Sequence, residues 1–292
     1  MSIRTILVPL DGSQEAMAAL QAAAAVGRIF RSHMEVLHVK PDARTAVPLL
    51  GEGMSGAMIE EMITLAEQEG NERSQKAHDQ FDEFCKANGI PVFDRETEEP
   101  GPAESVMAGW LEVTGREDQQ VGRTARLADL IVVSRAPDDG EFASGAVLNA
   151  ALFESGRPVL LAPPKLKEPF GKTIAVAWNG SAESARAVSG ALPFLKKADT
   201  VYALTADTEN TNQKVSNDLA DFCAWHGIKA EPVGFSPAGH SVGEAVLMEC
   251  EKLSADMLVM GAYTHSRMRQ LILGGLTDHV LHNATIPVLM AH

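Results

Sequence analysis

An internal repeat constrains the fold of this 292-residue chain more than any other feature of its sequence. Four blocks of the first half recur in the second half, in the same order. The pairs are ILVPLDGS and IAVAWNGS, FCKANGI and FCAWHGI, ADLIVVS and ADMLVMG, and RPVLLA and IPVLMA. Because such a repeat is one structural unit used twice, and because the length suits two domains, we expect two domains of the same fold.

Each copy alternates short apolar runs with longer amphipathic stretches, a pattern typical of βαβ units. In the second copy we expect strands near residues 172–178, 199–205, 229–235, 256–261 and 286–291, with helices between them. The runs IAVAW, MLVMG and PVLMA are continuously apolar, as in strands that helices cover on both faces. The sequence therefore predicts an α/β fold made of two tandem copies of a five-stranded, mostly parallel sheet with helices on both faces.

The join between the copies is expected at PPKLKEPFG, residues 163–171, because three prolines and a glycine interrupt strand and helix there. This boundary gives domains of residues 1–164 and 165–292. Ahead of its third repeated block the first copy is longer than the second by about 13 residues, which we place as an insertion near 110–125. An apolar stripe at Met54, Met58, Met62 and Leu65 has helical spacing and is interpreted as a core face, with an adaptable partner-binding face as the alternative.

Charge is unevenly divided between the halves. The chain carries −14 in total, of which residues 1–164 carry −12 and residues 165–292 carry −2. Such acidity disfavours binding to nucleic acid or to an anionic membrane, and the nearly neutral half would repel a phosphorylated ligand less. No window approaches 18 apolar residues, and few cysteines occur, so a cytoplasmic location without a membrane span is the expectation.

The segment GAYTHSRMRQLILGGLT, residues 261–277, follows a predicted strand and leads into a predicted helix. Glycines let a backbone approach an anion closely, and the first amides of a helix present unpaired donors to it. Arg267 would add positive charge and Thr277 a hydroxyl group. The segment is therefore either a phosphate cradle or a strand-to-helix turn that uses glycine for geometry alone.

ILVPLDGS at the first strand, ADLIV or ADMLVMG at the fourth, the glycine-bearing loop and the terminal PVLMA resemble the landmarks of the universal stress protein family. The resemblance covers essentially the whole chain. It implies a tandem pair of domains of the adenine nucleotide alpha hydrolase-like, Rossmann-like type, with strand order 3-2-1-4-5 in each. That order would bring Asn179 and Gly261 to one switch point and leave the two fifth strands as edges for pairing.

In family members that bind nucleotide, the loop reads Gly, two residues, Gly, nine residues, Gly, then Ser or Thr. Gly261 fits the first position and Gly274 the third, but Thr264 stands where the second glycine belongs and Gly275 where the hydroxyl residue belongs. The family's acidic residue at the end of the first strand is Asn179 in this copy, and Asn still offers a donor and an acceptor.

The first copy keeps that acid, Asp11, but has Ser134 in place of the first glycine, and its loop RAPDDGEFASG is acidic. We predict that this copy does not bind nucleotide. An alternative interpretation makes DGS and NGS only turns with a helix-capping serine. The resemblance thus implies a non-catalytic stress-response protein that binds ATP or another adenine nucleotide in the second half alone. The residues implied are Asn179, Gly180, Met260, Gly261, Thr264, Arg267, Gly274, Gly275, Leu276 and Thr277.

Two other functions remain open: a nucleotide-free interaction module that acts through protein partners, and a slow ATPase, which ranks last because no general base is evident. The two halves are expected to pair within the chain, and a homodimer is possible. His279 and His282 lack further ligands, so no metal is predicted. Cys85 and Cys223 are interpreted as apolar fillers, and the glutamates beside Cys250 would raise its pKa.

Overall fold

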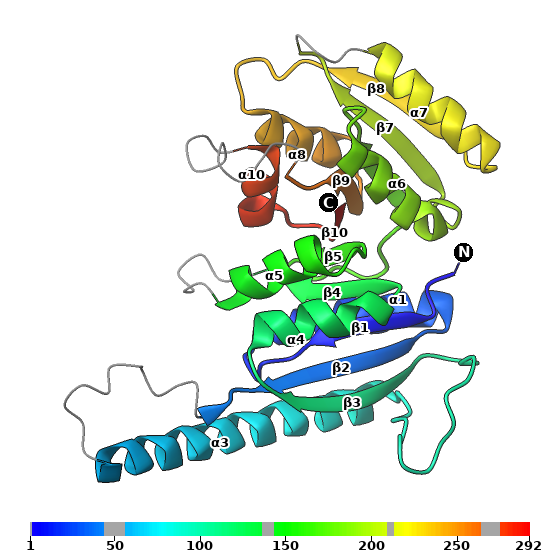
Figure 1. Ribbon diagram of the computed structural model, residues 1–292. Helices are drawn as coiled ribbons and strands as arrows, with labels where there is room; N and C mark the ends of the chain where they lie inside the picture. Colours follow the sequence, from blue (N-terminus) through cyan, green and yellow to red (C-terminus); the bar gives the residue numbers. More distant parts are fainter. Residues whose placement is uncertain (1, 44–55, 136–142, 209–212, 264–274) are drawn as a thin grey trace.

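The computed structural model describes residues 2–43, 56–135, 143–208, 213–263 and 275–292 (Figure 1). The first half contains, in chain order, β1 (Thr5–Pro9), α1 (Ala16–Phe30), β2 (His33–Lys40), α3 (Gly56–Asn88), β3 (Met107–Thr114), α4 (Glu117–Thr124), the short η1 (Ala125–Leu127), β4 (Leu130–Ser134), α5 (Ala143–Glu154) and β5 (Val159–Ala162). The second half contains β6 (Thr173–Ala177), α6 (Ala182–Leu195), β7 (Thr200–Ala206), α7 (Gln213–Trp225), β8 (Ala230–Phe235), α8 (Val242–Lys252), β9 (Met257–Gly261), α10 (Leu276–Asn283) and β10 (Val288–Ala291). All five strands expected in the second copy are present.

The ten strands form one continuous sheet in the order β3-β2-β1-β4-β5-β10-β9-β6-β7-β8. Each half has the expected order 3-2-1-4-5, and neighbouring strands within a half are parallel. The two fifth strands pair antiparallel, with Val288 opposite Leu161 and Met290 opposite Val159. The α/β fold with helices on both faces is therefore confirmed, and the halves share their sheet.

The central strands are buried because helices cover them on both sides. Every residue of β9 and β10 is buried, as is the whole of β5. One apolar cluster contains residues of both halves, and the rings of Phe30 and Phe194 meet edge to face with centroids 5.1 Å apart. Seven of the fifteen residues of α1 are alanines, all of them buried, so this helix lies close against the sheet. A core that spans the join makes the two halves one packed unit.

The expected insertion near 110–125 is wrong. Those residues form β3 and α4. Strand β3 has the same position in the sheet order as β8 of the second half, and α4 follows it in the chain as α8 follows β8. The first half is longer at two other places: α3 has 33 residues where α7 has 13, and residues 89–106 connect α3 to β3 where the second half has only 226–229. The error arose because β3 lies at the edge of the sheet and is half exposed, so it lacks the continuous apolar run that marks the buried strands.

The stripe in residues 54–65 is not a core face. Met58, Met62 and Leu65 are 52%, 39% and 56% exposed, and Met54 lies outside the described residues. Figure 1 shows the first part of α3 extending beyond the sheet. Only the later turns of the helix are buried, through residues such as Ala77 and Phe81. Helical spacing predicted the helix correctly but not which part of it meets the sheet.

The two edge strands of the sheet, β3 and β8, differ in what limits further strand pairing. Beside β3, the inserted segment 89–106 adds two backbone hydrogen bonds, from the Phe93 amide to the Ala108 carbonyl (2.6 Å) and from the Ala108 amide to the Pro91 carbonyl (2.9 Å). At the far end, β8 contains Pro232, which has no amide hydrogen to donate. Within the described ranges, no helix is long and apolar enough to cross a membrane.

Candidate functional site

In a doubly wound sheet, ligands bind where the strand order reverses, beside the carboxyl ends of the first and fourth strands. In the second half these are β6 and β9, and the pairing of Ala177 with Met260 places their ends side by side. Asn179 follows β6, and Gly261 is the last residue of β9. The structure therefore brings Asn179, Gly180, Met260 and Gly261 to one switch point, as the sequence predicted.

The turn after β6 is held by its own side chains. The Ser181 amide donates to Oδ1 of Asn179 (3.1 Å), Gly180 has a φ of +75°, and the Ser184 amide donates to Oγ of Ser181 (3.2 Å). A positive φ favours glycine, and the serine contact is an N-cap of α6. The turn-and-cap interpretation is therefore correct for NGS, whatever further role its residues have.

DGS in the first half has the same construction. The Ser13 amide donates to Oδ1 of Asp11 (2.9 Å), and the Ala16 amide donates to Oγ of Ser13 (3.2 Å). Gly12 also has a positive φ, of +83°. The repeat in sequence is thus a repeat in hydrogen bonding.

Gly261 is required by close packing against α6. A Cβ atom at this position would lie 2.5 Å from the Ser184 amide nitrogen and 2.8 Å from the Glu183 carbonyl carbon, distances that real side chains do not show. Met260, beside it, is fully buried in the strand. The first glycine of the loop pattern therefore has a structural reason to be glycine that the sequence did not indicate.

The far end of the glycine-bearing loop is the first turn of α10. Gly275 is its N-cap residue and is exposed, and Leu276 is half-buried. Thr277 is buried, and its Oγ1 accepts a hydrogen bond from the Tyr263 amide (3.2 Å), which joins the two ends of the loop. The remaining predicted residues, Thr264, Arg267 and Gly274, lie outside the described residues.

Two side chains at this switch point accept hydrogen bonds from the backbone, Asn179 through Oδ1 and Thr277 through Oγ1. Among the described residues, no acceptor is found for the NH2 group of Asn179 or the hydroxyl hydrogen of Thr277, so both can donate to a ligand. The start of α10 adds backbone amides that have no partner within the helix. A set of donors suits a ligand rich in acceptors, such as an adenine base or a phosphate group. These residues fit an adenine nucleotide.

One carboxylate works against an anionic ligand here. Glu183, in the first turn of α6, lies beside Gly261. Burial alone would raise its pKa, but hydrogen bonds from its own amide and from Ser181, together with the charges of Arg186 and His292, lower it overall. Glu183 is therefore ionised at neutral pH and adds negative charge beside the switch point.

In the first half, α3 lies over the equivalent turn. A Cβ atom on Gly12 would be 3.4 Å from the Arg73 carbonyl oxygen and 3.5 Å from the Ala77 amide nitrogen, and Nε2 of Gln80 donates to the Gly12 carbonyl (3.2 Å). For a Cβ atom on the corresponding Gly180, the nearest atom among the described residues is a methyl group of Val215, at 3.8 Å. Helix α3 thus packs against the turn formed by DGS.

A second carboxylate joins Asp11 in that half. Glu117 is half-buried at the start of α4, and burial, followed by the nearby charge of Asp11, raises its pKa to about 7, although the charge of Arg73 opposes the shift. With such a pKa, Glu117 is about half ionised at neutral pH, so together with Asp11 and Arg73 it gives this switch point a small negative balance. Ser134 ends β4, and most of the acidic loop after it lies outside the described residues.

The first half also supports the switch point of the second. Phe153 of α5 contacts the ring of Tyr263 with centroids 5.3 Å apart and the ring of His292 at 4.5 Å, and Nδ1 of His292 is 3.1 Å from the Ala262 carbonyl oxygen. Tyr263 has a φ of +55°. The sequence did not indicate these contacts, because they form only once the two halves meet.

Arg135 makes a second link between the halves. Its Nη1 donates to the carbonyl oxygens of His282 (2.7 Å) and Ala284 (3.1 Å), at the carboxyl end of α10. A cation at this end of a helix stabilises it, because the last carbonyl groups lack partners and carry partial negative charge.

Cys85, Cys223 and Cys250 are buried, and burial raises the pKa of each thiol, to about 11 for Cys85 and about 12 for Cys250, where the two adjacent glutamates add to the effect. Buried thiols of raised pKa are unreactive. In the described part of the chain, histidines, cysteines and acids form no group able to hold a metal ion.

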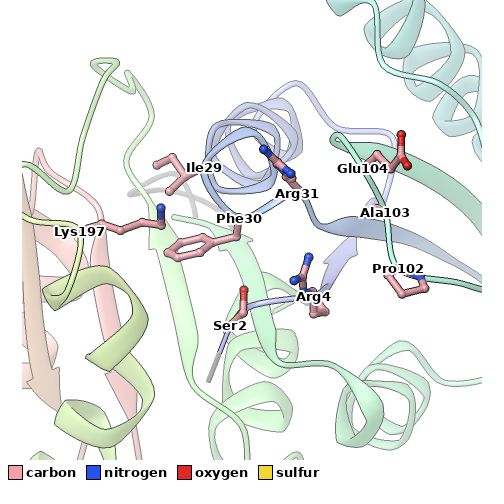
Figure 2. A pocket seen from close by; sticks show the side chains of 9 residues that line it. All are labelled: Ser2, Arg4, Ile29, Phe30, Arg31, Pro102, Ala103, Glu104 and Lys197. Atoms are coloured by element: carbon pink, nitrogen blue, oxygen red, sulfur yellow. The ribbon is translucent and has the colours of Figure 1, made fainter. Parts of the chain in front are cut away.

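A basic cavity of about 560 Å³ lies near the join, on the side of the first half where its strands begin (Figure 2). Arg4, Arg31 and Lys197 surround it, and Nζ of Lys197 is 5.6 Å from the ring centroid of Phe30. All three cations are exposed, so water and salt screen their charge strongly. It is a shallow surface feature and not a built site.

Comparison with known proteins agrees with this architecture. The family model described as "Universal stress protein family" matches residues 2–163 and 228–292. Universal stress protein Slr1230 of Synechocystis sp. is 27% identical over 168 residues, which are 55% of this chain and 57% of that protein. The match therefore spans just over half the length of this curated relative.

Solved structures show the same fold over the whole chain. A universal stress protein from Archaeoglobus fulgidus DSM 4304 superposes with a TM-score of 0.66 at 18% identity, covering 98% of this chain and 97% of that one. A putative universal stress protein from Pseudomonas aeruginosa UCBPP-PA14 gives 0.52 at 17% identity, covering 98% and 92%. Because the family model matches well over half of the chain, the chain belongs to the universal stress protein family.

Proposed function

We propose that this chain is a non-catalytic stress-response protein that binds one adenine nucleotide, such as ATP, in its second half. The observation that carries the proposal is the set of donors at the second switch point, namely the NH2 group of Asn179, the hydroxyl of Thr277 and the first amides of α10. Asn179 would contact the base, and the start of α10 would contact phosphate oxygens.

The contrast between the halves supports a single site. In the first half, α3 lies against Gly12, and Asp11 and Glu117 give the region a negative balance. Leu148 stands where the second half has Thr277, counted back from Pro158 and Pro287, so the hydroxyl group is also missing. A triphosphate would meet both a steric and an electrostatic barrier there.

The substitution Gly275→Asp separates binding from folding. A side chain at this position meets open space, and aspartate is a better N-cap than glycine, so the folded state should gain stability slightly. The same carboxylate would repel phosphate at the helix start. We expect isothermal titration with ATP to show one site per chain in the native protein and at least about tenfold weaker binding in the variant.

The matched control is Ala146→Asp, because Ala146 stands twelve residues before Pro158 as Gly275 stands twelve before Pro287. It adds the same charge to an exposed position of the first half and should leave ATP affinity unchanged. Absence of heat with ATP, ADP and AMP alike, or equal affinity for Gly275→Asp and the native chain, would remove the nucleotide from the proposal.

The second candidate is an interaction module that acts through protein partners without a nucleotide. Two observations favour it: the close contact of Gly261 with α6, which gives that glycine a purely structural reason, and the ionised Glu183 beside it. Protein purified without added nucleotide distinguishes the two, since native mass spectrometry of the intact chain would detect a retained adenine nucleotide only in the first case.

A further inference from the structure

We propose that the cavity enclosed by the inserted segment 89–106 binds a small organic cation that carries an ammonium or guanidinium group. The cavity has a volume of about 780 Å³ and lies where β1, β2 and β3 begin. It is therefore at the opposite end of the strands from the switch point of its half. Figure 1 shows this segment as the long connection that returns from α3 to β3.

The cavity has the size and walls of a ligand site. Small-molecule sites typically enclose about 300–1,000 Å³ and have mainly apolar walls with a few polar groups. Here Phe93, Pro91, Pro100 and Met107 supply apolar surface, and about two thirds of the lining comes from the inserted segment and its neighbours. An aromatic wall also attracts cations through the negative face of its ring.

Acidic side chains outnumber basic ones around this space. Its charged lining residues are Glu35, Glu98, Glu99, Glu104, Arg4 and Arg95, a balance of −2 with His33 neutral. This excess of negative charge favours a cationic ligand over an anionic one. The neighbouring basic cavity of Figure 2 shares Arg4 and Glu104 but has the opposite balance, so the two would select different ligands.

Glu35 supplies the specific contact. Its side chain is only 16% exposed; Oε2 pairs with Arg95 and lies 3.5 Å from Nε2 of His33. The other oxygen, Oε1, is shielded from solvent and has no hydrogen-bond partner among the described residues. A buried acceptor without a donor is costly, and an N–H group of a ligand would satisfy it. Arg95 is half exposed, so it can move aside and admit such a group.

The repeat provides an internal comparison. Glu35 pairs in register with Leu7, and Tyr202 pairs with the equivalent Ala175, so tyrosine takes the place of Glu35 in the second half. Thr200 likewise takes the place of His33. The second half also lacks the inserted segment. The buried acid, its histidine and the segment that covers them therefore occur in one copy only, and together.

The test is isothermal titration of the full chain with agmatine, which carries a guanidinium and an ammonium group but no carboxylate. We expect one agmatine per chain at low ionic strength. Glu35→Gln should weaken binding at least about tenfold, which corresponds to about 1.4 kcal/mol. The control Glu231→Gln removes one negative charge from exposed β8 of the other half and should leave the affinity unchanged.

A second variant protects the test if Glu35→Gln fails to fold. Glu98→Gln with Glu99→Gln changes two exposed residues of the inserted segment, so thermal unfolding should stay the same while agmatine binding weakens about threefold. Binding that neither variant changes, no heat at millimolar agmatine, or equal binding of acetate would overturn the proposal. Gly275→Asp should leave agmatine affinity intact, so failure here and failure of the nucleotide proposal are distinguishable.

Discussion

Two glycines at the second switch point differ in the room around them, and their substitutions should separate accordingly. Gly261→Ala would put a methyl group 2.5 Å from the Ser184 amide nitrogen, whereas Gly275→Ala meets open space. Displacing a well-packed helix costs about 1–3 kcal/mol. We expect urea unfolding to show a loss of that size for Gly261→Ala and a change below about 0.5 kcal/mol for Gly275→Ala. Equal stabilities would mean that α6 shifts freely.

Glu117 should make stability depend on pH near neutrality. Its folded pKa of about 7 lies above its ordinary value of 4.5, with Asp11, Arg73 and Asp118 facing it. Between those values the folded chain holds a proton that the unfolded chain has released, so stability falls as pH rises through this range. In Glu117→Gln the difference in unfolding free energy between pH 4 and pH 8 should change by about 3 kcal/mol.

The control for this prediction is Glu72→Gln on exposed α3, which should follow the native pH curve. Urea unfolding of the three proteins at several pH values measures the effect. A native-like curve for Glu117→Gln would show that burial does not hold the proton on this side chain.

For single residues, the sequence predicted only contacts between residues that are close together in the chain. The capping roles of Ser13 and Ser181 were readable because donor and acceptor are three residues apart. The contact of Gly261 with Ser184 was not, because it joins residues far apart in the chain that only the sheet brings together.

At the scale of elements, α10 should depend on Arg135. This arginine reaches from the first half to two carbonyl oxygens at the end of the helix, so Arg135→Ala leaves them without their charged donor. We expect faster hydrogen exchange throughout α10 and a loss of about 1–3 kcal/mol in stability. Arg116→Ala, which removes only an exposed ion pair with Asp118, should have little effect on either. Unchanged exchange in α10 would show that this link does not hold the helix.

Elements were predictable where burial is complete and uncertain where it is partial. Strands β9 and β10 are apolar throughout and were found within a residue or two. By contrast, most residues of β3 at the sheet edge are only partly buried or exposed, and the apolar side chains in the first turns of α3 are exposed. The amino-acid types in these segments say little about where the segments lie in the fold. For this reason the predictions of an insertion near 110–125 and of a core face in residues 54–65 were wrong.

For the whole molecule, the antiparallel join of β5 and β10 predicts mutual dependence of the halves. Residues 1–164 and 165–292 expressed separately would each expose an apolar edge strand and part of a shared core. We expect each to self-associate in native mass spectrometry and the mixture to give a 1:1 complex. As a control, a chain cut at a protease site placed within 163–171 should remain one particle. If the separate halves stayed monomeric and formed no complex when mixed, the predicted mutual dependence would be contradicted.

The strand order of each half was predictable from the family resemblance, and the fifth strands were singled out as pairing edges. The contacts between side chains of the two halves, such as Phe153 with Tyr263, could not be predicted, because the repeat pattern describes each half alone. Consequently the sequence predicted which strand ends meet at the second switch point, but not which residues of the other half pack against them.

The ends of the ten-stranded sheet bear on how this protein meets copies of itself. Joining the halves uses both fifth strands, which leaves only β3 and β8 as terminal strands. The first already bonds the segment around Phe93, and the second is interrupted by Pro232. Neither end offers an uninterrupted row of donors and acceptors, so the sheet stops growing at ten strands. Self-association by adding strands is therefore disfavoured, and exposed helical surface, such as that of α7 with its 91% exposed Trp225, is the alternative.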